Sequence, residues 1–230
     1  MRRSRCSCKH IRCIAFDVDG VLVEFESSWW RVHEALGTTK LAKLNHELYR
    51  RGRIGYWEWM YLDTLLWIEA KPAITRWELE RILEPPRLSP RLRKLIAKLK
   101  RLGLRIILVS GGIDVLVARI AQALGVDAWD SPRLAFDPWG RLVPGGYPSV
   151  IAGRKSEALS RLLERIGATL EETIFIGDSV WDIDAMDKCC YSIAYNPRDS
   201  LVVESACSVA TSLDELEAEI MILLGRRGMR

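Results

Sequence analysis

Two aspartates lie two residues apart in the segment Asp17-Val18-Asp19-Gly20, and they are the clearest candidates for catalytic chemistry in this sequence. The mostly apolar run 11–16 before them predicts a buried strand, and Gly20 allows a sharp turn directly afterwards. Both carboxylates are therefore expected just beyond the carboxyl end of a strand, where open α/β sheets bind ligands. Two acids this close repel each other unless a cation or a shared proton separates their roles. The pair predicts a metal-assisted site with one nucleophilic and one proton-transferring carboxylate.

Three further groups carry side chains that suit the same site. Ser110-Gly111-Gly112 follows a second apolar run, and a hydroxyl beside glycine amides at a helix start suits a phosphate group. Lys155 stands at the start of a predicted helix. Asp178 and Asp182 follow a third apolar run, and their spacing puts both on one face if a helix begins there. Oxygen ligands without an obligatory histidine favour Mg²⁺ as the metal.

Each of these groups alone also has an ordinary structural explanation. A Ser-Gly-Gly segment is often only a turn, a lysine before a helix is often exposed, and Asp178 could be a helix N-cap. The order of the groups along the chain favours a shared functional site over separate structural roles, because three of the four follow directly on an apolar strand. All of them are then expected at the same edge of one sheet.

Apolar strands alternate with amphipathic helices from residue 88 onward, which predicts a parallel sheet covered by helices on both faces. The region between the first strand and residue 87 has only helical patterns and is rich in tryptophan, so we expect an inserted all-helical module. The expected elements are strands at 11–16, 104–109, 126–129, 173–176, 192–194 and 208–210, helices at 90–102, 113–124, 156–166 and 213–224, and a hairpin at 133–143.

The composition is that of an ordinary folded domain. The chain has 230 residues, 49% hydrophobic and 28% charged, which allows one large domain with an insertion. A net charge of +4 is too small to indicate a nucleic-acid partner, although it suits a small anionic substrate. No apolar stretch has the length of a membrane span, so no membrane partner is expected. The oligomeric state has no signature in the sequence.

Six cysteines are unevenly placed, at Cys6, Cys8, Cys13, Cys189, Cys190 and Cys207. A domain of this length does not need disulfides, so we expect free thiols and a reducing cytoplasm, with the disulfide-bearing cytoplasm of a hyperthermophile as the alternative. The close spacing of Cys6, Cys8 and His10 matches no common zinc loop, so we expect no zinc site there.

Taken together, Asp17-x-Asp19, Ser110, Lys155 and Asp178-x₃-Asp182 resemble the four motifs of the haloacid dehalogenase-like superfamily of aspartate-nucleophile phosphatases. The resemblance spans nearly the whole chain, and Val-Ser-Gly-Gly at 109–112 is similar to the phosphoserine phosphatase-like branch. It implies a Rossmann-like α/β core formed by residues 1–23 and 88–230, and a helical C1-type cap formed by residues 24–87.

The resemblance also implies a role for each motif residue. Asp17 would attack phosphorus and become an aspartyl phosphate, while Asp19 would protonate the leaving alcohol and then activate water. Ser110, Gly111 and Lys155 would bind the phosphoryl oxygens.

The metal site follows from the same resemblance. Mg²⁺ would be held by Asp17, the backbone carbonyl of Asp19 and Asp178, and Asp182 would support this metal shell.

The substrate is expected to be a small phosphorylated metabolite, with phosphoserine as one candidate. In the phosphoserine enzymes a cap glutamate holds the substrate amine and a cap arginine holds its carboxylate. Glu26 matches the glutamate, whereas Leu62 falls where the arginine is expected. Arg53 or Arg50 is a candidate replacement from another turn. Trp181 also stands where those enzymes usually carry asparagine. Both differences count against phosphoserine.

Most aromatic side chains of the cap are expected to be core, with a pocket for a ring-bearing ester as the alternative. His33 and His46 have no acid partner at a readable spacing and are expected to be structural or exposed.

The sequence thus predicts a cytoplasmic, Mg²⁺-dependent phosphomonoester hydrolase. One alternative is a phosphotransferase of the same fold that passes the phosphoryl group to an alcohol. A regulatory protein on an inactive scaffold is disfavoured because all the motif residues are present, and a response-regulator receiver is disfavoured by the cap and the length.

Overall fold

The computed structural model describes residues 6–84 and 88–225, so the terminal arginines 2, 3, 5, 226, 227 and 230 lie outside the described residues. A six-stranded sheet with the order β3-β2-β1-β6-β7-β8 forms its centre, and every neighbouring pair is parallel. The strands are β1 Cys13–Phe16, β2 Arg105–Val109, β3 Ala128–Asp130, β6 Thr173–Gly177, β7 Tyr191–Tyr195 and β8 Ser208–Ala210. The α/β, Rossmann-like fold expected from the sequence is confirmed.

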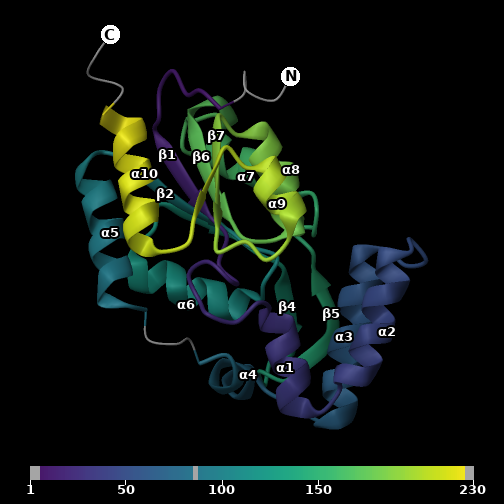
Figure 1. Cartoon of the computed structure of the whole chain (residues 1–230). Coiled ribbons are helices and arrows are strands. Elements are labelled where there is room, and N and C mark those ends of the chain that lie inside the picture. The colour runs from purple at the N-terminus through teal and green to yellow at the C-terminus, as the bar shows by residue number, and fades with distance from the viewer. Residues whose placement is uncertain (1–5, 85–87, 226–230) are drawn as a thin grey trace.

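Helices cover both faces of this sheet (Figure 1). The helices are α5 Pro90–Arg101, α6 Asp114–Leu124, α7 Lys155–Arg165, α8 Ile183–Lys188, α9 Ser200–Ser205 and α10 Leu213–Gly225. Ile14 and Phe16 of β1 face α5, α6 and α10, whereas Cys13 and Ala15 face α7, α8 and α9. All four residues of β1 are buried, because the central strand is covered on both sides.

Four helices between β1 and α5 form a separate layer beside the carboxyl edge of the sheet, which we call the helical module (Figure 1). They are α1 Ser28–Leu36, α2 Thr39–Arg50, α3 Tyr56–Ala70 and α4 Arg76–Ile82. The hairpin of β4 Arg133–Phe136 and β5 Leu142–Tyr147 packs on this module. The backbone N–H of Gly145 donates to Thr64 Oγ1 at 2.7 Å, and a Cβ on Gly146 would lie 2.3 Å from Met60 Cε. The hairpin therefore belongs spatially with the helices, although it follows β3 in the chain.

A buried histidine ties two helices of the module together. The Trp67 indole N–H donates to His33 Nδ1 at 3.0 Å, and His33 Nε2 lies 3.4 Å from Asp63 Oδ2. An indole nitrogen can only donate, so His33 Nδ1 must accept and the ring proton sits on Nε2. His33 is structural, one of the two outcomes expected for it, and it has an acid partner that the sequence spacing did not show. That partner lies 30 residues away on another helix.

Two disulfides correct the expectation of free thiols. Cys6 pairs with Cys207 and Cys8 pairs with Cys190, while Cys13 and Cys189 are buried free cysteines. Cys190 directly precedes β7 and Cys207 directly precedes β8. These parallel strands are neighbours, so their starts lie about one strand spacing apart, which two residues of extended chain can match.

Among residues 6–84 and 88–225, no helix is both long enough and apolar enough to cross a membrane.

Candidate functional site

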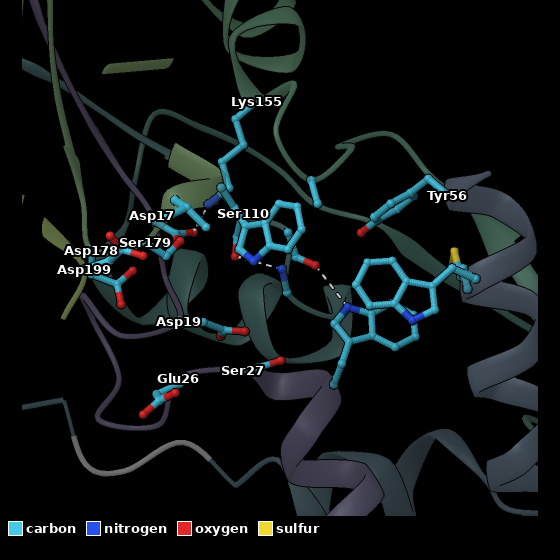
Figure 2. A pocket seen from close by; sticks show the side chains of 18 of the residues that line it. Asp17, Asp19, Glu26, Ser27, Tyr56, Ser110, Lys155, Asp178, Ser179 and Asp199 are labelled. Atoms are coloured by element: carbon cyan, nitrogen blue, oxygen red, sulfur yellow. Dashed lines mark hydrogen bonds and ion pairs between the residues drawn. The ribbon is translucent and has the colours of Figure 1, made fainter. Parts of the chain in front are cut away.

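One pocket at the carboxyl edge of the sheet collects the predicted motif residues other than Asp182, which is fully buried (Figure 2). Asp17 follows β1, Ser110 follows β2 and Asp178 follows β6, while Lys155 is the first residue of α7. Because β2, β1 and β6 are adjacent and parallel, the residues that follow them meet at one place. Asp19 and Gly111 line the same pocket.

Lys155 links the carboxylates at the base of the pocket. Its Nζ lies 2.9 Å from Asp17 Oδ1 and 2.6 Å from Asp182 Oδ1, and its side chain is 3% exposed. Burial alone would lower the pKa of Lys155, but the two carboxylates outweigh burial and raise it above its usual value. Lys155 is therefore a fixed positive charge beside Asp17.

Asp182 has both carboxylate oxygens engaged and shapes the loop after β6. Its Oδ2 accepts from the backbone N–H groups of Asp178 and Ser179, each at 3.1 Å, while its Oδ1 accepts from Lys155. A Cβ on Gly177 would lie 2.5 Å from Asp182 Cγ, so only glycine fits there. The segment Val180–Asp182 is a 3₁₀ helix in which Asp182 bonds back to the preceding turn. Asp182 is thus suited to orient Lys155 and Asp178.

A divalent cation fits the acid group formed by Asp17, Asp178 and Asp182. Each offers a carboxylate oxygen, and these oxygens lie within 4.8 Å of one another. Burial, reinforced by the charges of Asp17 and Asp182, raises the pKa of Asp178 to about 8. Burial also raises the pKa of Asp17 to about 7, against the opposing effect of Lys155. One lysine does not balance three carboxylates, and hard oxygen donors suit Mg²⁺.

Asp19 is held by the first residue of the helical module. Its Oδ2 accepts from the Ser28 N–H at 2.7 Å and from the Ser28 hydroxyl at 2.8 Å, whereas its buried Oδ1 has no hydrogen-bond partner. Burial raises the pKa of Asp19 above its usual value, and the two bonds from Ser28 oppose this. Sequence reasoning missed Ser28. Its only signal is its place directly after Ser27, the N-cap of α1.

The Ser110-Gly111-Gly112 loop also contacts the helical module. The Ile113 N–H donates to Ser28 Oγ at 2.9 Å, and the Trp29 indole donates to Gly111 O at 3.0 Å. A Cβ on Gly112 would lie 2.7 Å from both Asp19 Oδ2 and Ser28 Oγ. Glycine at position 112 therefore permits the close approach of the module to the loop, and buried Ser110 accepts the Gly112 N–H at 3.0 Å.

The two predicted substrate residues of the cap have different positions. Glu26 lines the pocket and forms an ion pair with Arg198, which follows β7. Arg53 is exposed in the turn between α2 and α3 and is not among the residues that line the pocket. This position does not support its predicted role. The helical pattern of the sequence did not show on which side of the module this turn would lie.

The expectation that the cap aromatics are mostly core is only partly right. Trp67 is fully buried, but Trp29, Tyr56 and Trp59 line the pocket. Trp181 lines it as well, and its ring centroid lies 6.3 Å from that of Tyr49. An aromatic wall thus faces the acid group.

Comparison with known proteins settles the family. A family model described as haloacid dehalogenase-like hydrolase matches residues 11–189. The chain belongs to the haloacid dehalogenase-like hydrolase family. This membership confirms the family expected from the motifs.

The relatives of this hydrolase include phosphoserine phosphatases. The protein of that name from Streptomyces coelicolor is 26% identical over 216 residues, covering 93% of this chain and 50% of the relative. The one from Albidiferax ferrireducens is 24% identical over 202 residues, covering 83% of this chain and 81% of the relative. The chain thus spans about half the length of some of the curated relatives it matches.

Solved structures show the same fold. A substrate-bound phosphoserine phosphatase has a TM-score of 0.73 with this hydrolase at 21% identity, covering 92% of this chain and 98% of that one. At 21% sequence identity, the similarity to this solved structure is evidence for the fold alone.

Gly20 provides a test of the metal site. Its φ is +77°, and a Cβ there would lie 2.1 Å from Asp178 Oδ2. The Gly20→Ala substitution should therefore displace the Asp178 carboxylate and abolish most of the stabilisation by Mg²⁺ in thermal unfolding. The unstrained αL conformation is also lost, at about 1–2 kcal/mol.

Gly140→Ala is the matched control. Gly140 has a φ of +78°, and no atom lies within 4 Å of the position that a Cβ would occupy there. Gly140→Ala should have a similar backbone cost but keep the wild-type response to Mg²⁺. Equal Mg²⁺ responses in the two variants would contradict the placement of Asp178 at the metal.

Proposed function

We propose that this protein is a Mg²⁺-dependent phosphomonoester hydrolase that works through an aspartyl-phosphate intermediate. The observation that supports this best is the single pocket in which Asp17 lies beside Lys155, with Ser110 and Asp178 around it. This arrangement has a nucleophile, a fixed cation and a metal-ligand group within reach of one phosphate. The phosphoserine phosphatases among its relatives support the same reaction.

Asp17 is the proposed nucleophile. A carboxylate oxygen of Asp17 forms a bond to phosphorus while the bond between phosphorus and the ester oxygen breaks. Asp19 gives its proton to that leaving oxygen, so that a neutral alcohol departs. The covalent product is a mixed anhydride of Asp17 and phosphate.

The second half of the reaction regenerates the enzyme. Asp19, now ionised, removes a proton from water as the water oxygen attacks phosphorus. The bond between Asp17 and phosphorus breaks, and inorganic phosphate leaves. The two hydrogen bonds from Ser28 to Asp19 favour the ionised form that this step begins from.

Phosphate binding is assigned to Ser110, Gly111 and Lys155. Ser110 and Lys155 are buried at the base of the pocket, where water does not screen them. Asp17 and Asp178 would hold the metal, together with the backbone carbonyl of Asp19, and Asp182 would support them. When bound, Mg²⁺ supplies positive charge that stabilises the phosphoryl oxygens as the bond breaks.

Control of substrate access is assigned to the helical module. In this proposal residues 24–87 form a cap over the site. Ser28 and Trp29 contact the site directly, so the module and the chemistry are physically linked. The proposed substrate is a small phosphorylated metabolite, with Glu26 at the pocket entrance as a contact for it. A cytoplasmic location belongs to the proposal, in a cell whose cytoplasm keeps disulfides oxidised, as in some hyperthermophiles.

Replacement of the nucleophile tests the proposal. Asp17→Asn should lower the Mg²⁺-dependent hydrolysis of an aryl phosphate by at least roughly a thousandfold, because an amide cannot form the intermediate. Asp114→Asn is the control, since Asp114 is buried on α6 outside the pocket. Undiminished turnover by folded Asp17→Asn would refute the assignment.

Removal of the Ser28 hydroxyl tests the link to the helical module. Ser28→Ala loses the hydroxyl contact with Asp19 and the acceptor for the Ile113 N–H, and it keeps the backbone N–H contact with Asp19. We expect kcat to fall by about 10- to 100-fold with little change in KM, because proton transfer depends on the position of Asp19. Ser131→Ala is a control at a fully buried serine whose hydroxyl makes no hydrogen bond. A change in KM alone would contradict this role.

A further inference from the structure

The pocket continues from the phosphate end into an aromatic chamber within a cavity of about 370 Å³. Tyr56 and Trp59 come from α3, Trp29 comes from α1 and Trp181 follows β6. Figure 2 shows Tyr56 on the side of the pocket opposite Asp17 and Asp178, with its hydroxyl directed inward. The ring of Trp59 also stacks on Tyr49, with centroids 4.6 Å apart. The chamber therefore presents aromatic side chains to the part of a substrate that leaves with the alcohol.

A buried carboxylate lies in the wall of this chamber without a balancing cation. Asp63 lines the pocket and is only 4% exposed. Its Oδ1 accepts from Asn45 Nδ2 at 2.8 Å, and its Oδ2 faces His33 Nε2 at 3.4 Å. His33 is neutral, because its Nδ1 accepts from Trp67. Asp63 forms no ion pair with a lysine or arginine of the described residues, although buried carboxylates are generally paired.

The cations that line the pocket are already engaged. Lys155 binds Asp17 and Asp182, and Arg198 pairs with Glu26 at the exposed entrance. Among the described lining residues, no other lysine or arginine is present. The chamber is therefore suited to positive charge and unsuited to a second anionic group on the substrate.

Aromatic faces and an uncompensated carboxylate together form the environment that recognises an ammonium group. We propose that the chamber binds an ammonium group, so that the substrate is the phosphate monoester of an amino alcohol without a carboxylate. This proposal rests on the phosphatase function proposed above. In it the aromatic side chains of Trp59 and Tyr56 contact the cation, and Asp63 supplies the balancing charge.

Two other kinds of ester fit the chamber less well. Phosphoserine would bring a carboxylate beside Asp63 without a free cation to receive it, which costs desolvation and repulsion. A neutral ring would use the aromatic walls but would leave Asp63 buried and uncompensated. The ammonium ester satisfies both features at once.

Choline phosphate and 3,3-dimethylbutyl phosphate test the proposal, because they have nearly the same shape and differ in one positive charge. Wild-type protein with Mg²⁺ should show a kcat/KM at least about tenfold higher for choline phosphate. Ethanolamine phosphate should also exceed phosphoserine. A ratio near one between the two isosteric esters, or a preference for phosphoserine, would overturn the proposal.

Substitutions in the chamber show which residues cause the preference for choline phosphate over 3,3-dimethylbutyl phosphate. Asp63→Asn and Trp59→Leu should each reduce the ratio of the two kcat/KM values severalfold, whereas Asp114→Asn should keep the wild-type ratio. Both esters are measured on the same protein, so a loss of folded material cancels in the ratio. A wild-type ratio that persists in both chamber variants would show that the charge is recognised elsewhere.

Failure of the proposed function has a different outcome. If an aryl phosphate is hydrolysed but the ammonium esters are not preferred, only the chamber assignment fails. If no ester is hydrolysed, the phosphatase function fails, and calorimetric binding of the same two esters then decides the chamber assignment. Tighter binding of choline phosphate would support it, and equal or weaker binding would overturn it.

Discussion

The buried contacts of Lys155 with Asp17 and Asp182 are the constraint on which the rest of the site depends. They join three segments that follow or begin separate elements: the turn after β1, the start of α7 and the loop after β6. Removing Lys155 would leave both buried carboxylates without their cation, which is a large penalty. The parallel sheet brings the segments together, and these charges then fix the position of Asp17, the proposed nucleophile.

The helical module adds a second layer of control over the same centre. Ser28 binds Asp19 through both its N–H and its hydroxyl, so the carboxylate proposed to transfer protons is positioned by a residue of the module. Trp29 binds the loop after β2, and Asp63 lies in the wall of the chamber on α3. In the proposed function the core carries the reaction, while the module positions one catalytic group and shapes the space for the leaving alcohol.

The sheet and most of the site could be predicted from the sequence, because each motif is a short segment at the end of an apolar run. Asp17 and Asp178 meet since parallel strands share a carboxyl edge. The rest depends on contacts between distant segments. The His33–Asp63 link joins two helices, and the Cys6–Cys207 disulfide spans a sequence separation of 201. The position of Arg53 away from the residues that line the pocket could not be predicted for the same reason, since a helical pattern does not show which face of an inserted module meets the site.

The most direct test of the central claim is to identify the phosphorylated residue during turnover. Wild-type protein would be mixed with an aryl phosphate and Mg²⁺, quenched in acid within the steady state, digested and analysed by mass spectrometry. The account predicts that the peptide containing Asp17 carries the mass of one phosphoryl group, and that this species disappears when the substrate is exhausted. Phosphorylation of another residue, or turnover without any phosphorylated peptide, would contradict it.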